Sequence, residues 1–215
     1  TLTIIAAPLY LNLQSFTKSY DGTTDIDNNN LQSNIIYSIS GIINNEIISI
    51  ISYTAKFKRH TAGIHFIDIS NITLSGFTLS NYYLVPVPPL AGTILPRYVT
   101  ANFSGGNKTY DNTRIPGLMT YNLSGILGLE DVSISSYFPL FRTNRAGPQI
   151  IDISYVTLFG ITAPNYLVAP VLPIMALIYQ NFIKITFYGG NKFYDSYGTP
   201  GPLTYTIDGT FDPIT

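Results

Sequence analysis

The segment IDISNITLSGFTLSNYYLVP at residues 67–86 recurs as IDISYVTLFGITAPNYLVAP at residues 151–170. The likeness extends outward without gaps over residues 37–86 and 121–170, where 23 of the 50 aligned residues are identical. Chance matching would give only a few identities. Because recurrence at a fixed spacing is typical of repeat architectures, the sequence predicts a duplicated unit with a repeat period of about 84 residues.

A third copy begins at the same spacing. GGNK at residues 105–108 recurs at residues 189–192, and each is followed by a Tyr-Asp pair. The first such motif, KSYDGTT at residues 18–24, lies farther from its partner than the repeat period, by six residues. We place this six-residue difference in the polar run Asp25–Asn30, because surface loops tolerate insertions at low cost. The predicted domains are the tail of an earlier unit at 1–10, units at 11–94 and 95–178, and an incomplete third unit at 179–215.

Two-residue alternation of apolar and polar side chains fills each unit. Ile151–Ser154 and Val132–Ser135 alternate in this way, which is typical of half-buried strands. Turn-forming Gly and Asn residues separate these stretches, and no helical period persists for more than two turns. The sequence predicts an all-β fold, a tandem array of β-sandwich-like repeat units.

Apolar, Pro-rich segments follow the alternating stretches, LVPVPPL at residues 84–90 and LVAPVLP at residues 167–173. Proline favours extended, semi-rigid backbone. We expect these segments to be short linkers between units that pack against a unit or a neighbouring chain, and so to stiffen the array.

Composition bears on partners. Charged residues make up 11% of the chain and the net charge is −1, whereas soluble domains carry about 25% charged residues. A surface with so little charge repels copies of itself weakly. We therefore expect the chain to associate with itself, laterally or end to end through its β-structure.

The residue composition also disfavours several other partners and sites. No basic patch is present, so nucleic acid is a poor candidate, and the absence of Cys excludes disulfides and thiolate metal sites. The longest apolar run, residues 166–179, is interrupted by two prolines and is shorter than the roughly 20 residues of a membrane-spanning helix. Because Thr1 is not an initiator Met, we expect the sequence to be cut from a longer chain.

At the Tyr-Asp motif the sequence resembles the YDG repeats of large bacterial adhesins and haemagglutinin-like surface proteins. KSYDGTT at residues 18–24 matches the opening signature of that family. A closing pattern of Gly followed by Asn-Tyr appears at residues 75–82 and 159–166. In the later openings Asn112 and Ser196 replace the glycine. The resemblance implies secreted or cell-surface modules used as stalks or adhesive arrays, with no shared catalytic residues.

The residues shared by the copies are the candidate site residues, and we assign them a structural role. In a Tyr-Asp pair the Asp would accept hydrogen bonds from turn amides, while the Tyr ring packs and its hydroxyl finds a backbone acceptor. Binding of a cation or a partner is the alternative. The set comprises Tyr20, Asp21, Tyr110, Asp111, Tyr194, Asp195, Gly76, Gly160, Asn81, Tyr82, Asn165 and Tyr166.

Catalytic and metal sites are weakly supported. The run Asp25–Asn30 lacks the glycine and the distal glutamate of a calcium loop. His60 and His65, the only histidines, face Asn144 and Gln149 in the next copy, so a histidine site would be limited to one unit. Asp68 and Asp152 are expected to face solvent or to bind a neighbouring loop. We predict no catalytic residue, cofactor or metal.

These patterns favour a structural or adhesive extracellular fibre or stalk protein that assembles into a filament or surface layer. The alternative is an adhesin whose loops recognise a glycan or a host protein, a cell-surface or matrix ligand. An enzyme is the least favoured class. If the third unit ends at Thr215, strands from a neighbouring molecule would complete it by strand addition.

Overall fold

The computed structural model describes residues 3–26 and 37–209. The part of the polar run Asp25–Asn30 after Ile26 and the part of the third unit after Gly209 lie outside this range. The chain divides into two compact units. The first unit comprises residues 1–99, 125–133 and 158–169, and the second comprises residues 100–124, 134–157 and 170–215. The first unit therefore includes parts of both predicted repeats.

Strands make up the regular structure of the described residues, apart from two 3₁₀ turns, Leu79–Asn81 and Ala163–Asn165. The predicted all-β class is confirmed. The alternating segment Ile151–Ser154 lies within strand β12, and residues 133–135 of the other alternating segment begin strand β11. Period-2 alternation identified these strands because each buries one face and exposes the other.

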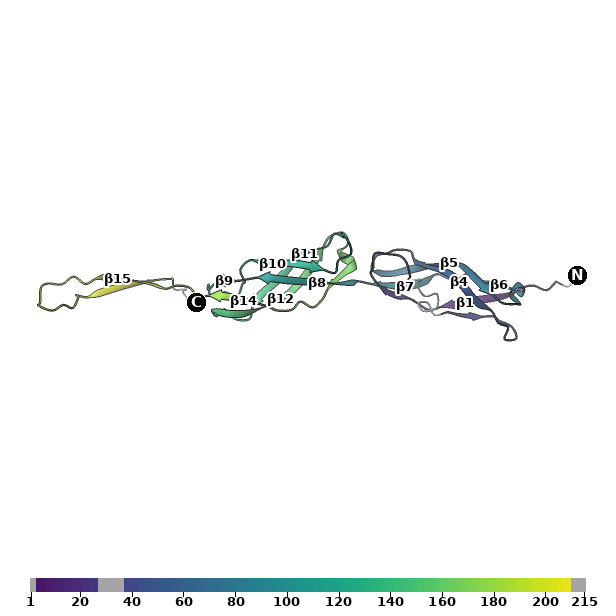
Figure 1. The fold of residues 1–215 in the computed structure, drawn as a ribbon, viewed down its shortest axis with the longest axis horizontal. Helices are drawn as coiled ribbons and strands as arrows, with labels where there is room; N and C mark the ends of the chain where they lie inside the picture. Colours follow the sequence, from purple (N-terminus) through teal and green to yellow (C-terminus); the bar gives the residue numbers. More distant parts are fainter. Residues whose placement is uncertain (1–2, 27–36, 210–215) are drawn as a thin grey trace. The chain divides into compact units, whose positions relative to one another are not determined.

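The first unit contains two sheets (Figure 1). The three-stranded sheet has the order β3 (Tyr37–Ser40), β1 (Ala7–Leu13), β6 (Tyr82–Leu84). The four-stranded sheet has the order β2 (Thr17–Ser19), β7 (Leu90–Leu95), β5 (Gly63–Ser75), β4 (Ser49–Phe57). β1 pairs in parallel with β6, and β2 pairs in parallel with β7. These parallel pairs join segments that are far apart in the sequence.

Both sheets contribute to one core in the first unit. Leu9 of β1, Ile48 and Tyr82 of β6 are buried together, and Leu74 of β5 packs against them.

At the other end of the four-stranded sheet, Gly92 of β7 leaves no room for a side chain. A Cβ there would lie 2.7 Å from Ile67 Cδ1 and 2.8 Å from the Phe16 carbonyl oxygen.

The same strand orders occur again in the later residues. One sheet has the order β10 (Met119–Ser124), β8 (Arg97–Gly105), β13 (Tyr166–Val168). The other has the order β11 (Ser133–Phe141), β12 (Gly147–Phe159), β14 (Ile174–Tyr179), β9 (Lys108–Thr109). A further hairpin joins β15 (Lys184–Gly189) to β16 (Leu203–Asp208).

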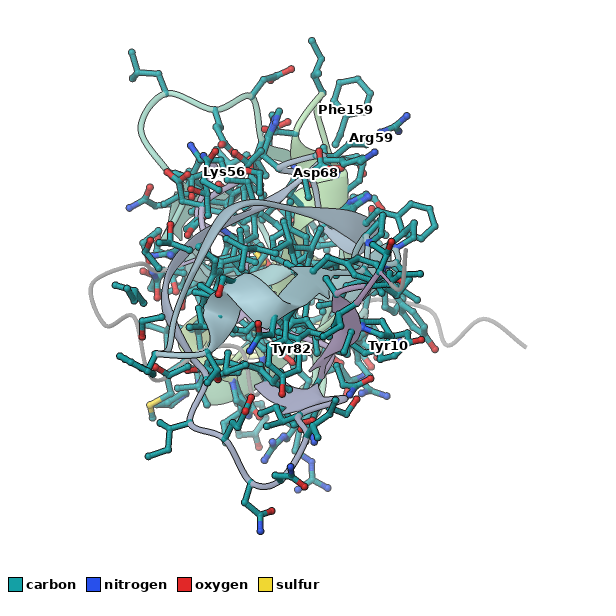
Figure 2. The ribbon with its side chains drawn as sticks, turned by 90° about the vertical axis from the view of Figure 1, so that its right-hand side faces the viewer. Tyr10, Lys56, Arg59, Asp68, Tyr82 and Phe159 are labelled. Atoms are coloured by element: carbon teal, nitrogen blue, oxygen red, sulfur yellow. The ribbon has the colours of Figure 1, made fainter. Side chains whose placement is uncertain are left out.

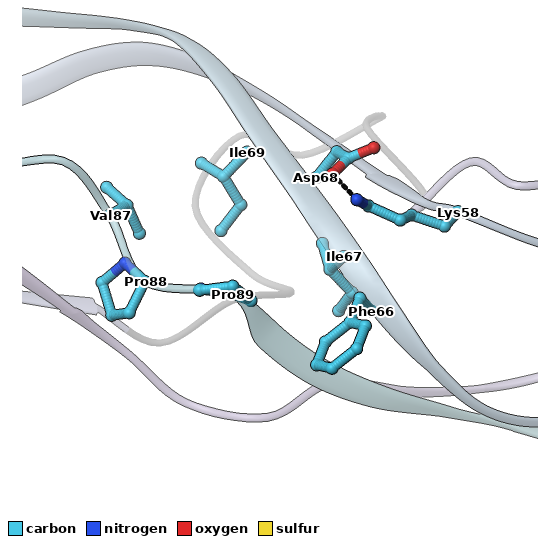
Figure 3. A pocket seen from close by; sticks show the side chains of 8 residues that line it. All are labelled: Lys58, Phe66, Ile67, Asp68, Ile69, Val87, Pro88 and Pro89. Atoms are coloured by element: carbon cyan, nitrogen blue, oxygen red, sulfur yellow. Dashed lines mark ion pairs between the residues drawn. The ribbon is translucent and has the colours of Figure 1, made fainter.

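The first predicted linker lies inside a compact unit. Residues 85–89 connect β6 to β7, and both strands belong to the two sheets of the first unit. Val87, Pro88 and Pro89 line a small pocket with Phe66 and Ile67 of β5 (Figure 3). The segment crosses from one sheet to the other rather than joining two units. Proline suits this crossover because its backbone needs no ladder hydrogen bond.

Among the described residues, no helix has the length and apolar character needed to cross a membrane.

Candidate functional site

The Tyr-Asp motifs form a turn built around a lysine. Lys18 Nζ lies 2.8 Å from Asp21 Oδ1 and also donates to the Thr23 carbonyl oxygen at 2.9 Å. Lys108 makes the same contacts with Asp111 and Thr113, at 2.6 and 2.8 Å. The lysine side chains are only 10% and 9% exposed. A charge so enclosed requires several acceptors, and the turn supplies them.

Each aspartate of these turns also accepts the backbone amide two residues later. Asp21 Oδ1 accepts from the Thr23 amide at 2.9 Å, and Asp111 and Asp195 make the equivalent bonds. The expected hydrogen bonds from turn amides are thus present. Burial raises the pKa of Asp21, but bonds from Lys18 and Thr23 outweigh it and hold the pKa below its ordinary value.

The tyrosine of the first motif lies in a buried cluster. Tyr20 is 1% exposed, and its hydroxyl donates to Glu130 Oε1 at 2.7 Å. The hydroxyl of Tyr166 donates to the other oxygen, Glu130 Oε2, at 2.6 Å. The two rings stand edge to face, with centroids 5.5 Å apart. We call Glu130, Tyr20 and Tyr166 the tyrosine clamp. All three residues belong to the first compact unit.

Strand pairing positions the members of the clamp. Tyr20 follows β2, and its amide donates to the Leu95 carbonyl oxygen at the end of β7, at 2.8 Å. Tyr166 begins β13 and is the register partner of Arg97, which begins β8 two residues after Leu95. Glu130 ends a turn in which its amide donates to the Leu127 carbonyl oxygen at 3.1 Å. Three segments remote in the sequence therefore meet at one carboxylate.

Burial and the shared carboxylate change the acidity of the two tyrosines. Burial, together with the hydrogen bond to Glu130, raises the pKa of Tyr20 to about 12. The pKa of Tyr166 is raised for the same two reasons. Tyrosine hydroxyls are protonated at neutral pH, and the raised pKa keeps both as hydrogen-bond donors to higher pH, which is the state that the clamp requires.

A second glutamate, Glu46, lies one repeat period before Glu130 and binds a single tyrosine. Tyr82 donates to Glu46 Oε2 at 2.6 Å, and the Thr78 hydroxyl donates to the same oxygen at 2.8 Å. The Ile43 amide donates to the Tyr82 hydroxyl at 3.0 Å, as the Leu127 amide donates to Tyr166 at 3.0 Å. Bonds from Tyr82 and Thr78 lower the pKa of Glu46. We call Glu46 and Tyr82 the half clamp.

The remaining candidate residues occupy different positions. Asn165 is buried and accepts the Ala62 amide at 2.9 Å, whereas its counterpart Asn81 is exposed. Gly76 and Gly160 have φ of 157° and 125° and lie against the carbonyl oxygens of Ile47 and Asp131, where a Cβ would collide. Tyr194 is 93% exposed.

Asp68 and Asp152 face outward and each forms an ion pair. Asp152 accepts two bonds from Arg142, each 2.9 Å long. Asp68 lies 3.3 Å from Lys58 Nζ (Figure 3). In Figure 2, Asp68 lies with Lys56, its register partner on β4, towards one side of the first unit, and Tyr82 lies lower in the view.

The side chain of His65 hydrogen-bonds within its own loop. His65 Nε2 lies 2.7 Å from the Thr61 carbonyl oxygen. No group of three or more metal-binding side chains occurs among the residues that the structure describes.

Sequence reasoning missed the acceptors of the clamp. The Tyr20 hydroxyl was expected to bond to the backbone, yet its partner is a side chain 110 residues away. A signal was nevertheless present, because Glu46 and Glu130 are the only glutamates in the sequence and lie one repeat period apart. Glu46 lies 36 residues before Tyr82, and Glu130 lies 36 residues before Tyr166, the second tyrosine that it binds.

The sequence that forms the first Tyr-Asp turn and most of the sheets around it matches a known family. The fold and site define an all-β protein with a lysine-centred Tyr-Asp turn. Residues 6–89 match the family model of the YDG domain, so the chain contains a YDG domain over that segment. No curated protein and no solved structure matches the chain.

Proposed function

We propose that this chain is a structural segment of an extracellular fibre or stalk, built from tandem YDG-like β units that assemble into a filament or surface layer. The proposal includes secretion or display at the cell surface and assigns the chain no catalytic reaction. It extends the YDG domain at residues 6–89 to the later repeat at residues 95–178.

The tyrosine clamp is the observation that carries the proposal. Tyr20 comes from the first predicted repeat, and Glu130 and Tyr166 come from the second. The clamp fixes Tyr20 of one repeat against a loop of the next through one hydrogen bond to a charged group, and the other carboxylate oxygen is held by Tyr166 of the same repeat as Glu130. Such bonds are roughly twice as strong as neutral ones. A joint of this kind favours a stiff array, which is what a stalk or fibre needs.

Surface composition supports the assembly part of the proposal. The net charge of −1 and the 11% of charged residues leave little repulsion between copies. Large apolar side chains are also exposed, among them Phe77, Leu129 and Phe182. Exposed apolar groups favour contacts between chains where they gather into one patch.

Sedimentation velocity over a range of protein concentrations tests this function. We expect the weight-average sedimentation coefficient to rise steadily with concentration, as open-ended association requires. A single monomeric species at every concentration would contradict the proposal.

A ligand-binding adhesin is the second candidate, and the segment between β15 and β16 favours it. Phe193, Tyr194 and Tyr197 are 97%, 93% and 75% exposed there. Exposed aromatic rings suit contact with sugars and proteins. A glycan array probed with the chain, and with a variant carrying Ala at all three positions, distinguishes the two functions. Binding that the triple variant loses would favour recognition over a purely structural role.

A further inference from the structure

The first Tyr-Asp turn contains an Asp-Gly pair at residues 21–22 that the later turns lack. Asn112 and Ser196 hold the position of Gly22, and their φ angles of 63° and 62° are close to its 77°. The backbone of the turn therefore accepts other residues at this position. What Gly22 allows is close packing, because a Cβ there would lie 3.8 Å from Glu130 Oε1 and a longer side chain would meet the clamp.

An Asp-Gly bond is especially prone to isomerise, because glycine has no side chain to shield its amide. The Gly22 nitrogen attacks Asp21 Cγ, the carboxyl hydroxyl leaves with the amide proton as water, and a succinimide ring closes. Water then adds to one of the two ring carbonyls and breaks its bond to nitrogen, which gives aspartate or isoaspartate. In isoaspartate the main chain runs through the side-chain carbon, and here that change would lie next to Tyr20 of the clamp.

Hydrogen bonds, rather than burial, hold the carboxylate of this pair. The Asp21 side chain is 48% exposed and Gly22 is exposed as well, so water reaches both groups. Asp21 Oδ1 accepts from Lys18 Nζ at 2.8 Å, and from the amide and the hydroxyl of Thr23, each at 2.9 Å. Asp21 Oδ2 accepts from Lys18 Nζ at 3.0 Å. Both oxygens are thus fixed, and none of these donors is the Gly22 amide.

These bonds oppose ring closure in two ways. Ring closure requires the carboxyl group to turn its face towards the Gly22 nitrogen, which would disrupt the charge-assisted bonds from Lys18. Ring closure also consumes the neutral acid. Burial raises the pKa of Asp21, but bonds from Lys18 and Thr23 outweigh it and keep the carboxylate ionised. Lys18 is itself held by the carbonyl oxygens of Thr23 and Asp25, at 2.9 and 2.8 Å.

We propose that Asp21-Gly22 is a latent isomerisation site and that Lys18 keeps it unreacted by holding the Asp21 carboxylate. The enclosed lysine then has a chemical role besides its structural one. Glycine at residue 22, which gives the clamp its room, is compatible with a lasting turn because of this lysine. The inference concerns the turn alone and holds whether or not the chain assembles.

Ageing of the whole protein in water labelled with the heavy isotope of oxygen tests the proposal. Each ring opening places one labelled oxygen at residue 21, and peptide mapping by mass spectrometry measures the label and the isoaspartate together. Lys18→Met keeps the length of the side chain and removes its charge. We expect it to raise the rate of label uptake at residue 21 about tenfold over the wild type, since a hydrogen bond to a charged group is lost.

Two controls connect the uptake to the Asp-Gly pair. Adding Gly22→Ala to Lys18→Met shields the attacking amide, and we expect uptake to fall back towards the wild-type rate. Lys108→Met removes the same bonds from Asp111, whose neighbour is Asn112 rather than glycine. We expect uptake at residue 111 in that variant to stay well below uptake at residue 21 in Lys18→Met.

A comparison with the unfolded chain separates protection by the lysine from general loosening of the fold. Uptake is measured in urea-unfolded wild type, and thermal melting is recorded for each variant. Thr23→Val removes one hydroxyl donor and leaves the lysine, so it keeps the test informative if Lys18→Met does not fold. We expect it to raise uptake about threefold, as loss of a weaker hydrogen bond would.

Two results overturn the proposal. One is uptake at residue 21 that is no faster in the folded variants Lys18→Met and Thr23→Val than in the wild type. The other is uptake in the folded wild type as fast as in the unfolded chain, which would show that the turn gives the Asp-Gly pair no protection.

Discussion

At the residue scale, Tyr20 makes the contact that is most specific to this architecture. Its side chain is buried and its hydroxyl reaches a carboxylate 110 residues away. The local motif accounts for the adjacent Lys18–Asp21 turn, whose atoms are close in sequence. It does not account for Glu130, because no local pattern specifies a partner brought close by parallel strand pairs. Only the repeat period pointed to that residue.

Replacing Tyr20 by Phe keeps the ring and removes its hydroxyl. We expect this variant to lose about 1.5–3 kcal/mol of unfolding free energy, the contribution of a hydrogen bond to a charged group. Urea denaturation measures the change. Tyr98→Phe is the control, because Tyr98 is 66% exposed and its loss of a hydroxyl should alter stability by less than about 0.5 kcal/mol. Equal effects of the two substitutions would contradict the role of the clamp.

The raised pKa of Tyr20 predicts a dependence of stability on alkaline pH. Folding raises this pKa from 10.0 to about 12, so the folded state holds the proton more tightly than the unfolded state does. The resulting stability is fully present below pH 10 and is lost as the pH rises through about 12. Over that interval we expect the melting temperature of the wild type to fall more than that of Tyr20→Phe. Parallel curves would show that Tyr20 titrates as in the unfolded chain.

At the element scale, alternation predicted individual strands but not their pairing. Residues 151–154 were expected to form a strand and lie in β12. Alternation cannot reveal that β2 pairs in parallel with β7, because both are short and their pairing depends on the whole sheet. The Pro-rich segment at residues 85–89 was misplaced for a similar reason. Its proline content correctly indicates an extended backbone. Which elements it connects depends on the sheets that β6 and β7 join, and composition does not reveal that.

Gly92 provides a test of the packing between these strands. A methyl group there would lie within 2.8 Å of Ile67, Phe16 and Phe57 atoms. We expect Gly92→Ala to destabilise the fold by about 1–3 kcal/mol through overpacking, as measured by thermal or chemical denaturation. Gly198→Ala is the control, since nothing lies within 4 Å of a Cβ at that position. A Gly92→Ala variant as stable as the control would contradict the packing of β7.

At the scale of the whole molecule, the repeat period and the recurring strand orders are the features most relevant to function. The sequence alone indicated the period and the all-β class. It could not indicate that the first compact unit would include residues 125–133 and 158–169. That grouping depends on contacts such as the clamp, which only the folded chain brings together.

Self-association should depend weakly on salt. Exposed charges are few, and added salt screens only exposed charges effectively. We therefore expect the apparent association constant from sedimentation equilibrium to change less than about threefold between low and high salt, well below the loss seen where several exposed ion pairs hold an interface. Dissociation of the assemblies on raising the salt concentration would indicate an interface built on charges instead.

Electron microscopy of negatively stained protein at high concentration tests the central claim most directly. We expect filaments whose length increases with protein concentration. Monodisperse particles of single-chain size, at every concentration at which the protein stays folded, would contradict it.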